Sequence, residues 1–357
     1  MSSYQSPLVN RLHPYVPGEQ RHGEGVTKLN TNENPYPPSP SVMQAIASVT
    51  GDDLRLYPDP EATKLRQALA DHEGVLADQV YVSNGSDETL GLAFMAFFTG
   101  KSALQFPNIS YSFYPVYCDL FAIEQKVVAV RKDLSLDLEQ FSLDAGGICF
   151  PNPNAPTGMA VTLADIESLL QRYTTGVVLI DEAYADFGAE SAIQLIDRYP
   201  NLLVTRTFSK GRSLAGMRIG AAFANAELIK ALAAVKNSFN SYPLDALAQV
   251  AAVASITDND YYESCIKKII TTRDRLTDSL KTRGFDVLPS AANFIFASPV
   301  NTPLNASELF AYLNKHDVLV RYWPKDPIGD WLRISIGTDA QTERLLDAMD
   351  QAFAEQR

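Results

Sequence analysis

The chain has 357 residues, of which 46% are hydrophobic and 20% charged, and its formal net charge is −12. This length and composition are ordinary for a globular enzyme with one large and one smaller domain. The negative charge argues against a nucleic-acid or anionic-membrane surface, because both require clustered positive charge.

The cysteines and histidines also narrow the class of protein. Three widely spaced cysteines form no Cys-x-x-Cys pair, and four histidines form no His-x-x-x-His pair. We therefore expect a reduced, cytoplasmic protein without a metal site. The first residues show no secretory signal, and no apolar run is long enough to span a bilayer, so no membrane association is expected.

The first thirty residues are rich in proline and glycine and predict an extended arm. The segment that ends in Asn34-Pro35-Tyr36-Pro37-Pro38 cannot form a helix or a central strand. Ser41 is the expected N-cap of a short helix up to Ser48, and an amphipathic helix is expected from Glu61 to about His72.

From Val80 onward, short β-rich segments alternate with helical patterns. Strands are expected at residues 80–82, 103–106, 126–130, 148–150, 177–180, 202–204 and 219–223. Helices are expected at residues 87–98, 163–173 and 226–235. This alternation predicts an α/β fold with a large domain built on a mainly parallel seven-stranded sheet. Ligands bind at the carboxyl ends of such strands, so polar clusters that follow them are candidate site residues.

The C-terminal part predicts a smaller α/β domain. Helices are expected at residues 244–256, 259–283 and 306–315 and from 339 onward, and strands at 294–297, 318–321 and 332–336. We place the domains at 1–30 (an arm that joins the small domain), 31–258 (large) and 259–357 (small).

The segment Thr205–Gly220 surrounds Lys210 with hydroxyls, small residues and cations, directly after an expected strand. Lysine forms Schiff bases with aldehyde cofactors, and its pKa falls readily on desolvation. Thr207, Ser209 and Arg218 supply two hydroxyls and a guanidinium, which suit a cofactor phosphate. Taken alone, the segment fits a solvated surface turn equally well.

Three more clusters follow expected strands. Gly85, Ser86 and Asp87 open a helix, where free N–H groups can bind a phosphate, although an ordinary helix cap has the same sequence. Tyr111 can stack on a planar ring or pack in the core. Asn154 lies in a loop rich in proline, where it either donates to a ligand oxygen or serves only the turn.

Asp181 ends an expected buried strand, where a carboxylate needs a partner. A protonated pyridine nitrogen is one such partner, and Tyr184, three residues on, is placed to reach the phenolic oxygen of the same ring. The alternative is a metal-binding pair of Asp181 and Glu182, which no other ligand cluster accompanies.

Arg321 and Arg333 lie in the C-terminal strands. An arginine in an apolar strand is expensive to bury without an anion. Arg333 therefore pairs either with a protein carboxylate or with a substrate carboxylate or phosphate.

Together these clusters resemble the fold-type I, pyridoxal-phosphate-dependent aminotransferases over nearly the whole chain. Within that superfamily the chain is similar to the histidinol-phosphate aminotransferase family. The resemblance rests on His13-Pro14-Tyr15-x-Pro17-Gly18, Leu29-Asn30-x-Asn32-Glu33-Asn34-Pro35-Tyr36, Tyr57-Pro58-Asp59, Gly85-Ser86-Asp87-Glu88, Val320-Arg321-Tyr322 and Leu332-Arg333-Ile334.

The resemblance implies a role for each matching position. Lys210 would bond to pyridoxal 5′-phosphate and then act as acid and base, with Asp181 on the pyridinium proton and Tyr184 on the phenolic oxygen. The other implied cofactor contacts are Tyr111 on the ring, and Gly85, Ser86, Asp87, Thr207, Ser209 and Arg218 on the phosphate. The implied substrate contacts are Tyr15, Asn32, Arg321 and Arg333.

Two further implications concern the loop at Asn154 and the assembly. Many relatives carry asparagine directly before Pro-Thr-Gly, where this chain has Ala155, so Asn154 is the candidate for the bond to the ring oxygen. In this family Tyr57 reaches the phosphate of the neighbouring subunit, which implies a homodimer.

The resemblance implies transamination between L-histidinol phosphate and 2-oxoglutarate, giving imidazole-acetol phosphate and glutamate in histidine biosynthesis. The partners would be these small molecules, without nucleic acid or membrane. An aromatic amino acid aminotransferase and a threonine-phosphate decarboxylase-like enzyme stay open as alternatives, because the same arginines can bind a phosphate or a carboxylate. A non-catalytic, cofactor-binding regulatory module is disfavoured by the acidic charge.

Overall fold

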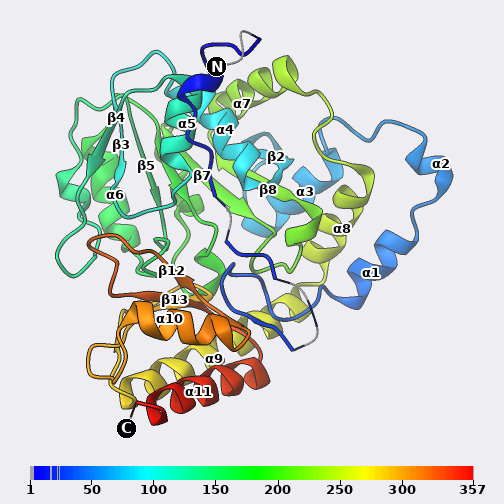
Figure 1. The fold of residues 1–357 in the computed structure, drawn as a ribbon. Helices are drawn as coiled ribbons and strands as arrows, with labels where there is room; N and C mark the ends of the chain where they lie inside the picture. The colour runs from blue at the N-terminus through cyan, green and yellow to red at the C-terminus, as the bar shows by residue number, and fades with distance from the viewer. Residues whose placement is uncertain (1–3, 17, 22, 24, 357) are drawn as a thin grey trace.

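The computed structural model describes residues 4–16, 18–21, 23 and 25–356, so Pro17 and His22 lie outside the described residues. Within that part of the chain, seven strands form one sheet in the order β2-β8-β7-β6-β5-β3-β4 (Figure 1). They are β2 (Val80–Asn84), β3 (Leu104–Pro107), β4 (Gln125–Val128), β5 (Gly147–Pro151), β6 (Val178–Asp181), β7 (Leu202–Thr207) and β8 (Ile219–Ala224). Strand β8 runs antiparallel to β2 and β7, and the other neighbours are parallel. The predicted α/β fold with a mainly parallel seven-stranded sheet is confirmed.

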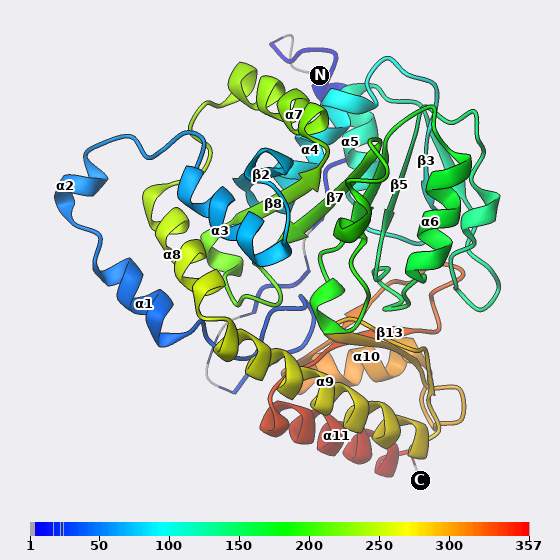
Figure 2. The ribbon, with the colours of Figure 1, turned by 180° about the vertical axis from the view of Figure 1, so that it is seen from behind.

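Helices cover both faces of this sheet, as the views from the two sides show (Figure 2). One face packs against α3 (Thr63–Glu73), α6 (Leu163–Arg172) and α8 (Ala246–Thr257). The other packs against α4 (Gly85–Phe97), α5 (Tyr114–Phe121) and α7 (Ala226–Phe239). The carboxyl ends of the parallel strands therefore stay open for a site.

A smaller α/β part lies below the large sheet in Figure 1. Among the described residues, a four-stranded antiparallel sheet has the order β12-β13-β10-β9. Its strands are β9 (Asp286–Val287), β10 (Phe294–Ser298), β12 (Arg321–Tyr322) and β13 (Leu332–Ser335), and its helices are α9 (Asn259–Thr282), α10 (Ala306–Lys315) and α11 (Asp339–Ala354). Strand β1 (Thr27–Lys28) pairs in parallel with β11 (Val318–Leu319) and so ties the segment before residue 30 to this part.

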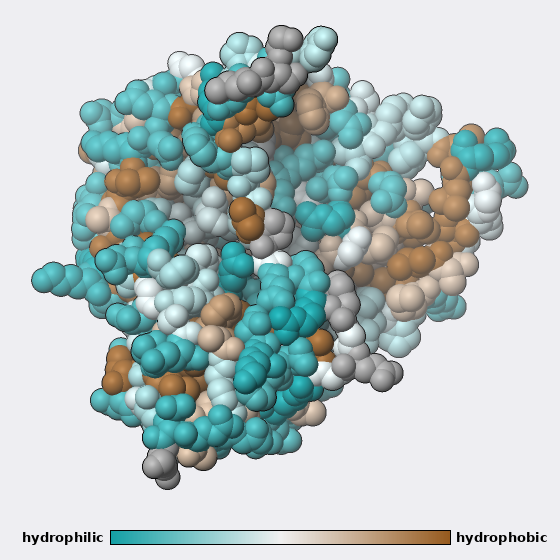
Figure 3. Space-filling view, in the orientation of Figure 1, coloured by the Kyte–Doolittle hydropathy of each residue, from teal (hydrophilic) through white to brown (hydrophobic). Residues whose placement is uncertain are grey.

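An apolar area covers the side of the molecule that carries α1 (Pro40–Ala47), α2 (Gly51–Leu54) and α8 (Figure 3). Its exposed members include Met43, Leu54, Leu56, Tyr57 and Val250. A contiguous exposed apolar area of this kind marks an interaction surface. No helix in the described part of the chain has both the length and the apolar character to cross a membrane.

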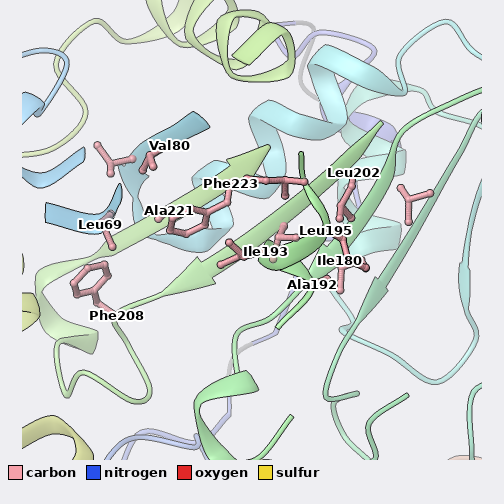
Figure 4. Close-up of a cluster of buried hydrophobic side chains, with 14 of the residues drawn as sticks. Leu69, Val80, Ile180, Ala192, Ile193, Leu195, Leu202, Phe208, Ala221 and Phe223 are labelled. Atoms are coloured by element: carbon pink, nitrogen blue, oxygen red, sulfur yellow. The ribbon is translucent and has the colours of Figure 1, made fainter. Parts of the chain in front are cut away.

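Alternating side chains of the strands build two separate cores. In β6, Val178 and Ile180 pack with α3, α6 and α8, whereas Leu179 packs with α4, α5 and α7. Figure 4 shows the first of these cores, in which Ile180 and Phe223 lie among side chains from neighbouring strands. Period-two alternation in buried strands requires apolar residues on both faces, which explains the continuous apolar runs of the sequence.

Several local predictions need correction. Ser39, not Ser41, caps α1, since its side chain accepts a hydrogen bond from the Val42 N–H and Pro40 occupies the first turn. Helices α2 and α5 were not predicted, and the single strand expected at 318–321 is divided into β11 and β12. Short 3-10 helices lie at Val9–Arg11, Ala77–Gln79, Leu138–Gln140, Ala185–Phe187, Ala192–Leu195 and Ala215–Met217.

Candidate active site

A cavity of about 450 Å³ lies at the carboxyl ends of β5, β6 and β7, next to strands β12 and β13. This is the edge of the sheet at which a ligand was expected. Most predicted site residues line it, namely Tyr15, Asn32, Ser86, Asp87, Tyr111, Asp181, Tyr184, Thr207, Ser209, Lys210, Arg218, Arg321 and Arg333. Gly85, Asn154 and Tyr57 are not among the lining residues.

Lys210 lies in the turn that follows β7, on the wall of the cavity. Its Nζ donates a hydrogen bond to the backbone oxygen of Thr31 at 3.0 Å and lies 5.8 Å from the centre of the Tyr184 ring. Among the described residues, Nζ therefore bonds to a neutral backbone oxygen and not to a carboxylate. A neutral acceptor competes only weakly with a ligand for the amine. Such an amine is available to bond to an aldehyde.

Asp181 is the last residue of β6 and is only 5% exposed. It accepts hydrogen bonds from the Tyr114 hydroxyl (3.2 Å), the Thr205 hydroxyl (3.3 Å) and the Ala183 N–H (3.3 Å). Burial raises the pKa of Asp181 to about 6, although these hydrogen bonds oppose the shift. Among the described residues it forms no ion pair, so this carboxylate lacks the cation that its burial demands.

Tyr184 and Asn32 form a hydrogen-bonded pair on the wall of the same cavity. The Asn32 Nδ2 donates to the Tyr184 hydroxyl at 3.1 Å. Asn32 itself is buried and held by Ser335, whose hydroxyl donates to its Oδ1 at 2.8 Å, and by Asn293, which donates to its backbone oxygen at 2.9 Å. The Tyr184 hydroxyl keeps its own proton free to donate into the cavity.

The start of α4 and the turn before β8 form a cradle for an anion. Gly85 has a φ of +84°, which favours glycine, and a Cβ at this residue would lie 2.6 Å from Nη2 of Arg218 and displace the guanidinium. Arg218 also contacts Asp87 at 3.4 Å, and Asp87 accepts a 2.8 Å hydrogen bond from Tyr111. The side chains of Thr207 and Ser209, both nearly buried, face the same cavity. Free N–H groups of a helix start, hydroxyls and a guanidinium suit a phosphate.

Two arginines form a second cationic group. Arg321 of β12 and Arg333 of β13 are direct cross-strand partners. Arg333 donates from Nη2 to the backbone oxygen of Asn30 at 2.7 Å, and its Nε is buried without a partner among the described residues. Burial and the nearby Arg321 lower the pKa of Arg333. In the described part of the chain neither guanidinium pairs with a carboxylate, so the pair is prepared for an anion from outside the protein.

Asn154 and Tyr57 do not reach this cavity. The Asn154 amide is used within the protein, because Nδ2 donates to the backbone oxygen of Ile109 (3.0 Å) and to the Thr157 hydroxyl (3.1 Å). Ala155 lines the cavity in its place, so the expectation that Asn154 contacts the ring oxygen is not supported by its position. Tyr57 is 82% exposed and stacks on Tyr242 with ring centres 4.6 Å apart.

Sequence reasoning missed two residues that hold Asp181. Tyr114 is fully buried and belongs to the same aromatic cluster as Tyr111. Thr205 lies two residues before Thr207 on β7, and a strand period of two places both on one face. The strand period was the signal that could have identified Thr205, whereas nothing in the sequence distinguished Tyr114 from a core tyrosine.

The site fits the cofactor that the sequence implies. A buried carboxylate without a cation suits a protonated ring nitrogen, and the glycine-lined cradle at Arg218 suits a phosphate. The alternative of a metal at Asp181 and Glu182 does not fit, because Glu182 is bound by Arg206 at 3.0 Å and by the Ser191 hydroxyl at 2.6 Å. No group of three or more potential metal ligands occurs among the residues that the structure describes.

Comparison with known proteins agrees with a site for pyridoxal phosphate. The family model described as "Aminotransferase class I and II" matches residues 24–349. The chain is 50% identical over 349 residues to histidinol-phosphate aminotransferase 1 of Hydrogenovibrio crunogenus, covering 98% of each chain. It is also 50% identical over 350 residues to histidinol-phosphate aminotransferase of Chromohalobacter salexigens, covering 98% of this chain and 99% of that one. Its structure resembles histidinol-phosphate aminotransferase of Sinorhizobium meliloti in complex with pyridoxal 5′-phosphate, with a TM-score of 0.90, 26% identity and coverage of 100% and 99%.

Proposed function

Because this chain belongs to the aminotransferase class I and II family, we propose that it transfers the amino group of L-histidinol phosphate to 2-oxoglutarate. The products are imidazole-acetol phosphate and glutamate, and the pathway is histidine biosynthesis. The enzyme is an aminotransferase whose cofactor is pyridoxal 5′-phosphate. The relatives that are 50% identical carry the choice of donor, and the cross-strand pair of Arg321 and Arg333 suits its phosphate.

The cofactor supplies an aldehyde and an electron-withdrawing ring that stabilises negative charge on the substrate carbon. Lys210 would hold the aldehyde through its Nζ, and the same amine would serve as the acid and base that moves the proton of the substrate carbon. Asp181, a buried carboxylate with no cation beside it among the described residues, would hold the proton on the ring nitrogen. Tyr184, oriented by Asn32, donates to the phenolic oxygen.

The remaining predicted residues hold cofactor and substrate. Tyr111 lines the cavity with its hydroxyl fixed by Asp87, and its ring would pack on that of the cofactor. The phosphate of the cofactor is held by the backbone of Gly85, Ser86 and Asp87 and by Thr207, Ser209 and Arg218. The substrates bind at Tyr15, Asn32, Arg321 and Arg333. The phosphate of histidinol phosphate occupies the two arginines in one half-reaction, and the carboxylate of 2-oxoglutarate occupies them in the other.

We also propose a homodimer in which Tyr57 enters the site of the partner. Its exposure and the apolar area over α1, α2 and α8 support this assembly, since both need a covering surface (Figure 3). We place the domain division at residue 258, because α8 packs in the core of the large sheet and α9 in that of the smaller one. A cytoplasmic location agrees with the free, buried thiols of Cys118, Cys149 and Cys265.

An absorption spectrum of the purified enzyme tests the proposal. We expect a band from the lysine-bound cofactor that disappears on addition of L-histidinol phosphate and returns with 2-oxoglutarate. The variant Lys210→Ala should lack the band and turnover, and full activity in that variant would contradict the scheme. A band that responds only to phenylalanine, or carbon dioxide release from threonine phosphate, would assign a different substrate.

A further inference from the structure

A short segment after β1 contacts both the side chain and the main chain of Lys210. The backbone oxygen of Thr31 accepts a hydrogen bond from Lys210 Nζ at 3.0 Å. Three residues on, the side chain of Asn34 reaches the main chain of the same lysine. Its Nδ2 donates to the backbone oxygens of Lys210 (3.1 Å) and Gly211 (3.0 Å). One amide group therefore bridges two consecutive carbonyls, those of the Lys210–Gly211 and Gly211–Arg212 peptide groups.

The amide of Asn34 is itself fixed. Its Oδ1 accepts a hydrogen bond from the Tyr36 N–H at 3.0 Å, which sets the orientation of Nδ2 toward the lysine turn. The proline that follows Asn34 restricts the backbone of the segment further. The donor is thus presented by a rigid loop rather than by a mobile side chain.

Asp186 packs against the same stretch of main chain. A Cβ at Gly211 would lie 2.1 Å from Oδ2 of Asp186 and 3.0 Å from the ring of Tyr262, so the main chain passes directly against these side chains. Asp186 is held in place by Arg206 at 2.7 Å. The main chain at Lys210 and Gly211 is therefore in contact with both Asn34 and Asp186.

We propose that Asn34 is a positioning residue, which fixes the main chain of Lys210 so that Nζ reaches the reacting carbon. This inference rests on the proposed function, because it takes Lys210 as the reacting amine. The lysine side chain has four flexible carbons, so the position of Nζ depends on a fixed main chain. A displacement of about 1 Å at a reacting group lowers a rate by about 100-fold.

Asn201 offers a matched control. Its Nδ2 also donates to two backbone oxygens, those of Tyr173 and Gly176, both at 3.0 Å. Asn201 directly precedes β7 and is not among the residues that line the cavity, so its amide closes a turn away from the site. Replacing either asparagine by aspartate removes the donor with almost no change in shape.

The test compares purified Asn34→Asp, Asn34→Ser and Asn201→Asp holoenzymes. Both Asn34 variants should lower kcat by about tenfold or more while KM for histidinol phosphate changes by less than about threefold, whereas Asn201→Asp keeps kcat within about twofold. An unchanged kcat in the Asn34 variants, or an equal loss in Asn201→Asp, would overturn the inference. If Asn34→Asp does not fold, the neutral variant Asn34→Ser provides the test.

Hydrogen–deuterium exchange of the same holoenzymes gives a readout that does not depend on turnover. The peptide that covers residues 208–213 should exchange about tenfold faster in Asn34→Ser and at the wild-type rate in Asn201→Asp. Unchanged exchange in Asn34→Ser would refute the positioning role. Failure of the proposed function would instead appear as wild-type enzyme that does not turn over histidinol phosphate.

Discussion

Replacing Asp181 by asparagine should make the cofactor-free protein more stable at neutral pH while weakening the cofactor site. Asp181 is 5% exposed and has no cation beside it among the described residues. Its hydrogen-bond donors, Tyr114 and Thr205, only partly replace water. Asparagine has nearly the same shape and no charge, so it avoids the desolvation of the carboxylate.

The size of the effect follows from the pKa. Burial raises the pKa of Asp181 from 3.8 to about 6, a change of roughly two units. One unit corresponds to about 1.4 kcal/mol, so the ionised carboxylate costs about 3 kcal/mol of folding free energy above pH 6. Between the two pKa values the native state binds more protons than the unfolded state, so wild-type stability falls as the pH rises from about 4 to about 6.

Urea denaturation of the cofactor-free proteins at about pH 4 and about pH 7.5 measures this difference. The free energy of unfolding of Asp181→Asn should equal that of wild type at the lower pH and exceed it by about 3 kcal/mol at the higher pH. Asp71→Asn, an exposed control on α3, should differ from wild type by less than about 0.5 kcal/mol at both. A difference that does not grow with pH, or a less stable Asp181→Asn at neutral pH, would refute the reasoning.

Three further predictions concern the cofactor cradle, the arginine pair and the assembly. Gly85→Ala places a Cβ 2.6 Å from Nη2 of Arg218 and should raise the dissociation constant of pyridoxal phosphate by about tenfold. Equilibrium dialysis measures this constant, and an unchanged value would contradict the phosphate cradle. Arg333→Met removes half of the cationic pair and should raise KM for histidinol phosphate by about 100-fold, whereas a change below about threefold would exclude a phosphate contact. The Tyr57→Ala and Lys210→Ala enzymes should each be weakly active or inactive. Activity should return when their subunits are dissociated and mixed, and no gain in activity would contradict a tyrosine shared between subunits.

The architecture was largely predictable because its signals are local. Seven β-rich segments and their helices follow from periodicity, and all seven strands occur within a few residues of the expected positions. The antiparallel direction of β8 could not be predicted, because a strand has the same pattern in either direction. Helix α5 (Tyr114–Phe121) was missed although Tyr114, Tyr117 and Cys118 form a buried stripe, because it has only eight residues and contains Pro115 in its first turn.

The candidate site was predictable only where chemistry is concentrated in a short segment. Lys210 and Arg218 lie eight residues apart in one turn, so their sequence context identifies them together. Asn34 and Lys210 are 176 residues apart, and their contact depends on how the segment after β1 crosses the sheet edge. Asn154 shows the converse, since a suitable residue one position from the expected one donates its amide to Ile109 and Thr157.

The neighbours Asp181 and Glu182 explain why a motif alone does not assign roles to adjacent acids. In an extended chain consecutive side chains point to opposite faces of the sheet. Asp181 shares its face with its cross-strand partner Thr205 and lines the cavity without a cation. Glu182 lies on the other face, where Arg206, one residue beyond Thr205, neutralises it at 3.0 Å. The strand period therefore leaves one carboxylate to bind a cationic ring and the other to form a buried ion pair, and only their partners across β7 distinguish the two.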